Sequence, residues 1–155
     1  MISPELLRRY PFFGQLSDAN LKALAMISEE QNAKAGEVIF TEGQPATHFY
    51  FLIEGSIDLS YTVEEGVHPK KRKTFQVGEI NPGEIFGLSA LIEPYIINAT
   101  GTAATNSRFI AIEANGLRAL MEMDHHLGFI FMRQVAKVVM EQLAAVRVQL
   151  AAAWA

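Results

Sequence analysis

The spacing of apolar residues changes twice along the chain, and the changes divide it into three regions. Near the N-terminus, Leu21 and Leu24 recur at the spacing that places one apolar stripe on a helix, and Ser17 can cap that helix. A shorter helix precedes it, with Pro4 in the first turn, where a proline is well tolerated. The pattern predicts N-terminal helices within residues 1–33.

Residues 34–113 instead carry short runs of β-branched and aromatic residues separated by glycine-containing turns. This pattern is typical of an all-β barrel or roll. The expected strands are Val38–Phe40, Phe49–Ile53, Ile57–Val63, Thr74–Val77, Ala99–Ala103 and Phe109–Ile112.

A basic run from Lys70 to Lys73 follows Gly66 and Pro69 in this region. Runs of like charge repel one another and favour solvent, so we expect a solvated hairpin loop here rather than an anion or partner site.

Residues 114–155 return to a helical pattern, with a helix over Leu117–Met123 and a long helix from a cap at Asp124 to about Ala152. The long helix carries an uncharged heptad seam of Phe129, Met132, Ala136, Val139, Leu143, Val146 and Leu150. A single helix cannot bury such a seam. We expect its first half to pack on the chain's own barrel and its second half to form a homodimer through Val139, Leu143, Val146 and Leu150.

Composition narrows the class of protein. The chain has 155 residues, which suits a single domain over residues 1–155. It is half hydrophobic without any run near the roughly 20 apolar residues that a membrane span needs, and no secretory signal is visible, so a soluble cytoplasmic protein is expected. There is no cysteine, and the net charge of -4 argues against DNA binding by this chain alone.

Three segments, Gly36–Gly43, Phe49–Gly55 and Pro82–Gly87, resemble the cyclic-nucleotide-binding domain family in order, spacing and residue type. The resemblance covers nearly the whole chain. It implies a mainly β fold with flanking helices: an eight-stranded β-roll, jelly-roll-like, with N-terminal helices and a long C-terminal helix. The likeness is to a catabolite-activator-type sensory domain without the DNA-binding part, either a stand-alone module or a fragment.

The resemblance also implies a ligand cassette at Phe86–Thr100, where the family presents backbone N–H groups of a short helix to the cyclic phosphate. Leu88 stands at the position of the family's ribose-binding Glu, and Ile97 at the position of its phosphate-binding Arg. Losing two charge-assisted contacts of about 1.5 to 3 kcal/mol each predicts binding weaker by two or more decades. The candidate cassette residues are Phe86, Gly87, Leu88, Ser89, Ala90, Ile97, Asn98, Ala99 and Thr100.

The sequence also lacks residues that could make other contacts to a nucleotide. The chain has no Ser or Thr after Ser107, so its C-terminal helix offers no hydroxyl to a base. Ser89, Asn98 and Thr100 are expected to make local caps and turn bonds, with a weak anion site at Gly87 to Ser89 left open.

These observations predict a non-catalytic regulatory or sensory module with a degenerate cassette, no cofactor and no tight binding of cyclic AMP or cyclic GMP. One alternative is a working sensor of a cyclic nucleotide or another small anion with an altered pocket. A less favoured alternative is a metal-dependent enzyme of the cupin type, but Glu42 and Glu54 look like turn residues and the histidines form no His-x-His pair. The histidines are His48, His68, His125 and His126.

Overall fold

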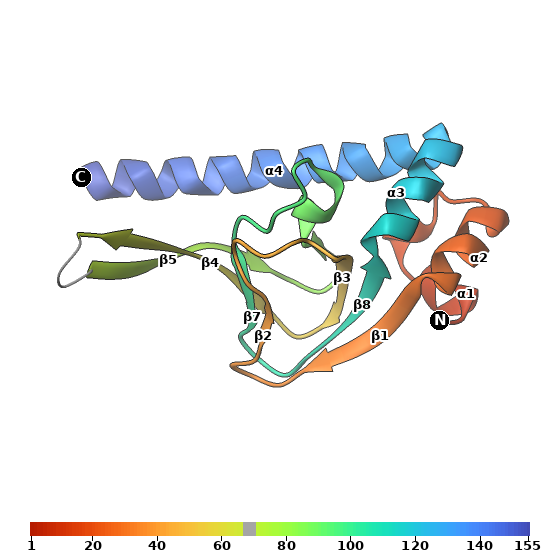
Figure 1. The fold of residues 1–155 in the computed structure, drawn as a ribbon, viewed down its shortest axis with the longest axis horizontal. Helices are drawn as coiled ribbons and strands as arrows, with labels where there is room; N and C mark the ends of the chain where they lie inside the picture. The colour runs from red at the N-terminus through yellow and green to blue at the C-terminus, as the bar shows by residue number, and fades with distance from the viewer. Residues whose placement is uncertain (67–70) are drawn as a thin grey trace.

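The computed structural model describes residues 1–66 and 71–155. Its eight described strands form two four-stranded antiparallel sheets (Figure 1). The first sheet has the order β1 (Ser28–Ala33), β8 (Ser107–Glu113), β3 (His48–Glu54) and β6 (Ile85–Phe86). The second has the order β2 (Val38–Phe40), β7 (Thr100–Ala103), β4 (Ile57–Glu65) and β5 (Lys71–Ile80). The expected β-roll with flanking helices is confirmed.

The two central strands of the first sheet are buried on both faces. One face of β3 places Phe49 and Phe51 against the helices, and the other places Tyr50 and Leu52 against the second sheet. This two-sided burial explains why β3 and β8 read as continuous apolar runs instead of alternating apolar and polar residues. The first sheet therefore separates two cores, one under the helices and one inside the roll.

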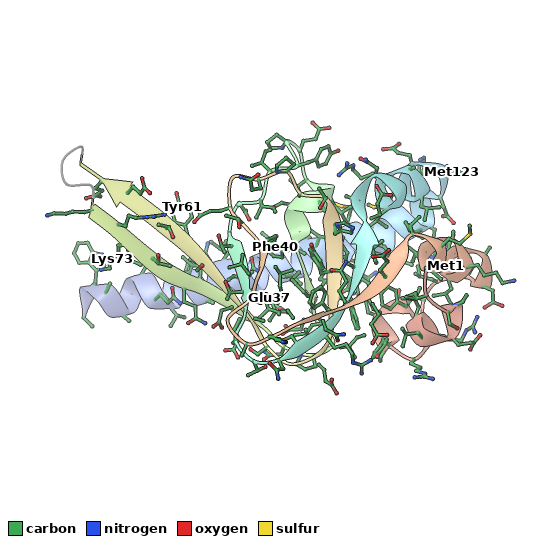
Figure 2. The ribbon with its side chains drawn as sticks, turned by 60° about the horizontal axis from the view of Figure 1, so that its bottom comes forward. Met1, Glu37, Phe40, Tyr61, Lys73 and Met123 are labelled. Carbon is green, nitrogen blue, oxygen red and sulfur yellow. The ribbon has the colours of Figure 1, made fainter. Side chains whose placement is uncertain are left out.

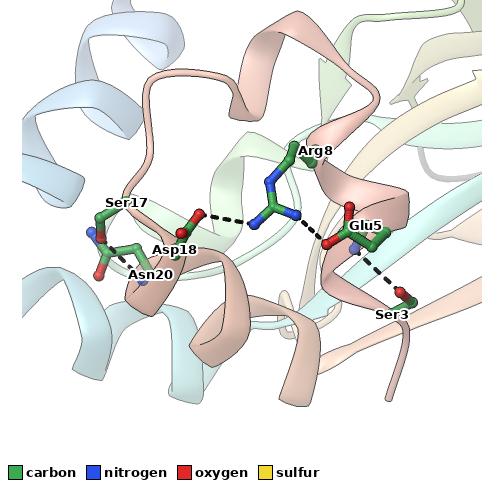
Figure 3. Close-up of polar contacts among 6 residues, drawn as sticks. All are labelled: Ser3, Glu5, Arg8, Ser17, Asp18 and Asn20. Atoms are coloured by element: carbon green, nitrogen blue, oxygen red, sulfur yellow. Dashed lines mark hydrogen bonds and ion pairs between the residues drawn. The ribbon is translucent and has the colours of Figure 1, made fainter.

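Six helical segments accompany the roll within the described residues. They are α1 (Pro4–Arg8), η1 (Pro11–Phe13), α2 (Asp18–Met26), η2 (Leu88–Leu91), α3 (Ala114–Met123) and α4 (His125–Trp154), where η denotes a 3-10 helix. As expected, Ser17 caps α2, its hydroxyl accepting from the amide of Asn20 at 3.2 Å. Arg8 pairs with Glu5 within α1 and ties α1 to α2 by pairing with Asp18 at 2.8 Å (Figure 3).

The β region begins earlier than the expected boundary at residue 34. Ser28–Ala33 forms β1, which pairs antiparallel with β8 along its whole length. Only the first and last residues of β1 are buried, so the strand shows no apolar alternation. Its place is fixed by pairing and by Ser28, whose buried hydroxyl donates to the carbonyl of Leu24 at 2.6 Å.

The basic run is strand rather than loop over the residues that the structure describes. Lys71, Arg72 and Lys73 begin β5, while Lys70 lies outside the described residues. The strand extends this far because acidic residues face it on β4: Glu65 is opposite Lys71, and Glu64 forms an ion pair with Arg72 at 3.1 Å. The resulting hairpin projects beyond the roll beside the second half of α4 (Figure 1).

The heptad seam of α4 does not pack on the roll as expected for its first half. That half buries Leu127, Ile130, Phe131 and Val135 instead. Phe129 remains 58% exposed, because the face that meets the roll is turned away from the seam. None of the described helices combines the length and hydropathy required to cross a membrane.

Candidate functional site

The cassette expected at Phe86–Thr100 is present as the connection between β6 and β7. It opens at Gly87, whose φ of 68° lies in the left-handed region, and continues into η2. A side chain on Gly87 would stand 2.6 Å from Cδ2 of Tyr50. Glycine therefore satisfies two requirements at this corner, an unusual backbone angle and a close approach to an aromatic ring.

Stacked aromatic rings form the floor beneath the cassette. Tyr50 lies over Phe86, with ring centroids 4.9 Å apart and planes 16° apart, and over Phe40 at 5.5 Å. Tyr50 is only 7% exposed, and this burial raises the pKa of its phenol. Figure 2 marks Phe40 on the roll and Tyr61 further out on the projecting hairpin.

Leu88 and Ile97, which the resemblance places at the ligand-gripping positions, contribute apolar surface. Leu88 is half-buried and packs against the core beneath the helices, and Ile97 is 8% exposed within the same core. The backbone of Ile97 is held by two hydrogen bonds: its N–H donates to Gln44 O at 2.9 Å, and its carbonyl accepts from Gly43 N at 2.8 Å. The backbone of the cassette is therefore held in place at Ile97.

The polar side chains of the cassette are bonded within the chain, but their partners lie nine and 58 residues away in sequence rather than in the local caps and turns that the sequence predicts. The Ser89 hydroxyl donates to Asn98 Oδ1 at 3.3 Å, which bridges the beginning and the end of the cassette. The Thr100 hydroxyl accepts from the backbone N–H of Glu42 at 3.1 Å.

A groove of about 600 Å³ separates the cassette from α4 and the projecting hairpin. We call it the cassette groove. Its walls are mainly apolar and include Ile92, Ile96, Tyr61, Val139, Leu143 and Val146. Three residues predicted for dimerisation, Val139, Leu143 and Val146, thus line this groove, whereas Leu150 does not and is 63% exposed.

Sequence reasoning missed a second pocket of about 240 Å³ on the other side of Gly87 and Ile97. The connection between β2 and β3, with Thr47, and the start of β3, with His48, form one wall. The Thr47 hydroxyl and His48 Nδ1 lie 2.9 Å apart. No sequence signal marks this pocket, because its walls come from segments that are separated along the chain.

Arg118 of α3 is a further contact that the sequence did not reveal. Its guanidinium donates through Nη1 to the carbonyl of Ala90 and lies 4.0 Å from the centroid of the Tyr95 ring. Arg118 therefore fastens η2 and the segment after it to the helices. An isolated arginine on an amphipathic helix carries no pattern that identifies its partner.

The structure brings together no metal-binding group among its described residues. His125 and His126 are exposed at the start of α4, and His68 lies outside the described residues. The two acidic residues interpreted as turn residues make structural contacts: Glu42 accepts from Thr62 N at 2.9 Å, and Glu54 pairs with Arg108 at 3.5 Å.

Comparisons with known proteins agree with this geometry. The model of the cyclic nucleotide-binding domain family matches residues 30–124. A structure from Geobacter metallireducens, assigned to the cyclic nucleotide-binding proteins, is 38% identical, with a TM-score of 0.77 over 92% of this chain and 99% of that one.

More distant relatives have varied roles. A cyclic nucleotide-gated ion channel of Arabidopsis thaliana is 29% identical over 77% of this chain and 15% of the channel. The regulatory subunit of a cAMP-independent protein kinase A from Trypanosoma brucei, in a triple mutant bound to cAMP, gives a TM-score of 0.72 at 18% identity, over 94% of this chain and 49% of that one. The chain spans 15% to 32% of the length of the first three curated relatives it matches.

The family match covers more than half of the chain, and the two sheets, the cassette and the flanking helices all agree with it. The chain belongs to the cyclic nucleotide-binding domain family and forms a regulatory or sensory domain of that family.

Proposed function

We propose that this domain is a non-catalytic regulatory module that does not bind cyclic AMP or cyclic GMP tightly. The observation that carries the proposal is the charge of the cassette groove. Among the described residues that line it, Glu93 is the only charged one, and no lysine or arginine is present.

A cyclic phosphate would lose water in this groove without gaining a cation. Removing the hydration of a charged group costs several kcal/mol unless a partner compensates it. Ile97 cannot supply a charge-assisted bond to the phosphate, and Leu88 cannot accept one from the ribose hydroxyl. The carboxylate of Glu93 would add repulsion of like charge.

A relative supports the idea that this fold can serve regulation without the usual ligand. The Trypanosoma brucei protein of similar fold is the regulatory subunit of a cAMP-independent kinase. We propose the same separation of fold from cyclic-nucleotide binding for this chain, with its output delivered by whatever protein it is attached to or associates with. Its expected cytoplasmic location and lack of enzymatic activity stay predictions.

Isothermal titration calorimetry with cyclic AMP and cyclic GMP tests the proposal. We expect no dissociation constant below about 100 μM for either nucleotide. A value of a few micromolar or less would overturn the proposal in favour of a working sensor with an altered pocket. A control titration with inorganic phosphate reports whether the backbone around Gly87 to Ser89 holds a small anion independently of a nucleotide.

We also propose that the domain forms a homodimer through α4. From residue 139 onward, the side chains of this helix are exposed except for the half-buried Gln142. The large apolar side chains of Met140 and Leu150 are 71% and 63% exposed, so covering them would remove apolar surface from water and stabilise the helix. A second copy of the same helix is the simplest cover, since most oligomers pair identical surfaces.

A further inference from the structure

The cassette groove is concave, and three separate parts of the chain supply its walls. The cassette contributes Ile92 and Ile96, β4 contributes Tyr61, and α4 contributes Val139 and Leu143. These five side chains are between 42% and 50% exposed, although they face one another across the groove. A ligand seated there would bury apolar surface from three directions at once, which the hydrophobic effect favours.

Charge narrows the class of ligand. The groove has a single carboxylate, Glu93, and no cation among its described lining residues. Anions are therefore disfavoured by repulsion and by lost hydration, while a cation would find one partner surrounded by apolar walls. Neutral molecules carry neither penalty.

Hydrogen-bonding groups are few and lie close to the apolar walls. Asn98 and Ser89 are bonded to each other, and Gln142 is the one half-buried residue in the second half of α4. The Asn98 and Gln142 side-chain amides can each both donate and accept. A small number of polar groups on mainly apolar walls is typical of sites that bind small organic molecules.

The volume of the cassette groove favours a small molecule over a partner helix as its occupant. Three turns of helix, about 10 Å wide and about 16 Å long, occupy on the order of 1,200 Å³. The groove holds about half of that volume, 600 Å³, which lies within the usual range of small-molecule pockets, about 300 to 1,000 Å³.

We propose that the cassette groove binds an uncharged, largely apolar small molecule that carries a hydrogen-bonding group. This proposal rests on the proposed function, since it assigns another class of ligand to the place where a cyclic nucleotide would sit. The ligand would connect the cassette to α4 by contacting both.

Two fluorescent probes with the same ring system test the proposal: neutral N-phenyl-1-naphthylamine and anionic 8-anilinonaphthalene-1-sulfonate. We expect the neutral probe to bind with one-to-one stoichiometry and a dissociation constant of about 10 μM or lower, and the anionic probe to bind at least tenfold more weakly. Equal affinities, or no saturable binding of the neutral probe, would overturn the proposal.

Matched variants test whether the probe binds in the cassette groove. Ile96→Asp adds a charge to the cassette wall, and Val139→Asp adds one to the α4 wall, so each should weaken the neutral probe at least tenfold. Val38→Asp is the control, because Val38 is 52% exposed on β2 and does not line the groove. Circular dichroism checks that each variant is folded. Equal binding by wild-type protein and both groove variants would show adsorption elsewhere and contradict the proposal.

The titration with cyclic nucleotides is a separate measurement that distinguishes failure of this inference from failure of the proposed function. Tight binding of cyclic AMP would overturn the proposed function, whereas failure of the neutral probe would overturn only this inference. Competition by a second copy is tested by repeating the probe titration at rising protein concentration. Affinity that falls as dimer forms would mean that the partner helix occupies the groove, which also contradicts the proposal.

Discussion

Gly87 and Tyr50 lie so close that a methyl group on Gly87 would stand 2.6 Å from the tyrosine ring. The contact joins the first residue of the cassette turn to β3, one of the two central strands of the first sheet. Because the backbone of Gly87 is also left-handed, the position of the whole cassette depends on a residue without a side chain.

Gly87→Ala should therefore destabilise the domain by about 2 to 4 kcal/mol, from backbone strain and overpacking together. Gly83→Ala is the control, since Gly83 has a similar positive φ but a methyl group there would meet no other atom within 4 Å. It should cost only about 1 to 2 kcal/mol. Urea unfolding measures both variants, and equal losses would show that the contact with Tyr50 is unimportant.

If the proposed function is correct, adding the two charged side chains that the family resemblance implies should create nucleotide binding. In the double variant Leu88→Glu, Ile97→Arg, we expect the affinity for cyclic AMP to rise at least 100-fold, because each charge-assisted hydrogen bond contributes about 1.5 to 3 kcal/mol. Calorimetry measures the change. The control is Leu88→Gln, Ile97→Met, which alters both side chains without adding charge; a similar gain in this variant would reject the charge argument.

A variant at Leu150 tests the proposed dimer without altering the cassette groove, because Leu150 belongs to the seam of α4 but does not line the groove. Light scattering after size exclusion should show a dimer for the wild-type chain and a monomer for Leu150→Glu, since a charge at an apolar interface is left without a partner. Val148→Glu is the control: Val148 is similarly exposed, at 69%, but lies outside the seam. A monomeric wild-type chain would contradict the dimer.

Asp124 should make the stability of the domain depend on pH. The pKa of its carboxyl is lowered, first by the hydrogen bond that Asn20 Nδ2 donates at 2.9 Å, and then by bonds from the backbone amides of Leu127 and His126. A lowered folded-state pKa means that the stabilisation is present above the ordinary aspartate pKa and is lost as the pH falls through the folded value.

Asp124→Ala should therefore reduce stability at pH 7, and its difference from the wild-type chain should shrink below roughly pH 4, near the ordinary aspartate pKa. Urea unfolding at several pH values follows this difference. Asn20→Ala is an independent check, because removing the first cause should raise the pKa of Asp124 as measured by carbon NMR. A difference that stays constant down to pH 2 would contradict the assignment.

Arg118 should limit the opening of the cassette. Arg118→Ala removes a charged hydrogen bond to Ala90 and a stacking contact with Tyr95, so amide exchange within residues 88–95 should accelerate about tenfold or more. Hydrogen exchange followed by mass spectrometry measures this change. Arg133→Ala is the control, since Arg133 lies over Phe129 on α4, away from the cassette. Equal acceleration in both variants would indicate general loosening instead.

Strands whose side chains are buried could be predicted from the sequence, whereas strands held mainly by backbone pairing with another strand could not. The apolar runs of β3 and β8 identify strands because burial on both faces selects apolar residues. Ser28–Ala33 carries no such pattern, since β1 has one partner strand and mostly exposed side chains. The sequence does not indicate the start of β5 for a related reason: the acidic residues that stabilise it stand on another strand, β4.

The candidate site shows the same division. Gly87 and the apolar residues of the cassette fix its backbone, so the family resemblance could place Phe86, Gly87 and Thr100 in the connection between β6 and β7 in advance. The cassette groove and the contact from Arg118 depend on how α3 and α4 return to the roll, and distances of that kind are not encoded in local spacing. The seam of α4 indicated an apolar surface but not the surface that would cover it.

The basic start of β5 has a consequence for aggregation. In the second sheet, β5 is one of the two outer strands, and the side of its ten residues that faces away from β4 would offer backbone groups to any other extended chain. Lys71, Arg72 and Lys73 stand at the exposed end of that edge. Two molecules approaching edge to edge in this region would bring like charges together, so the residues that complete the hairpin also discourage the growth of intermolecular sheets.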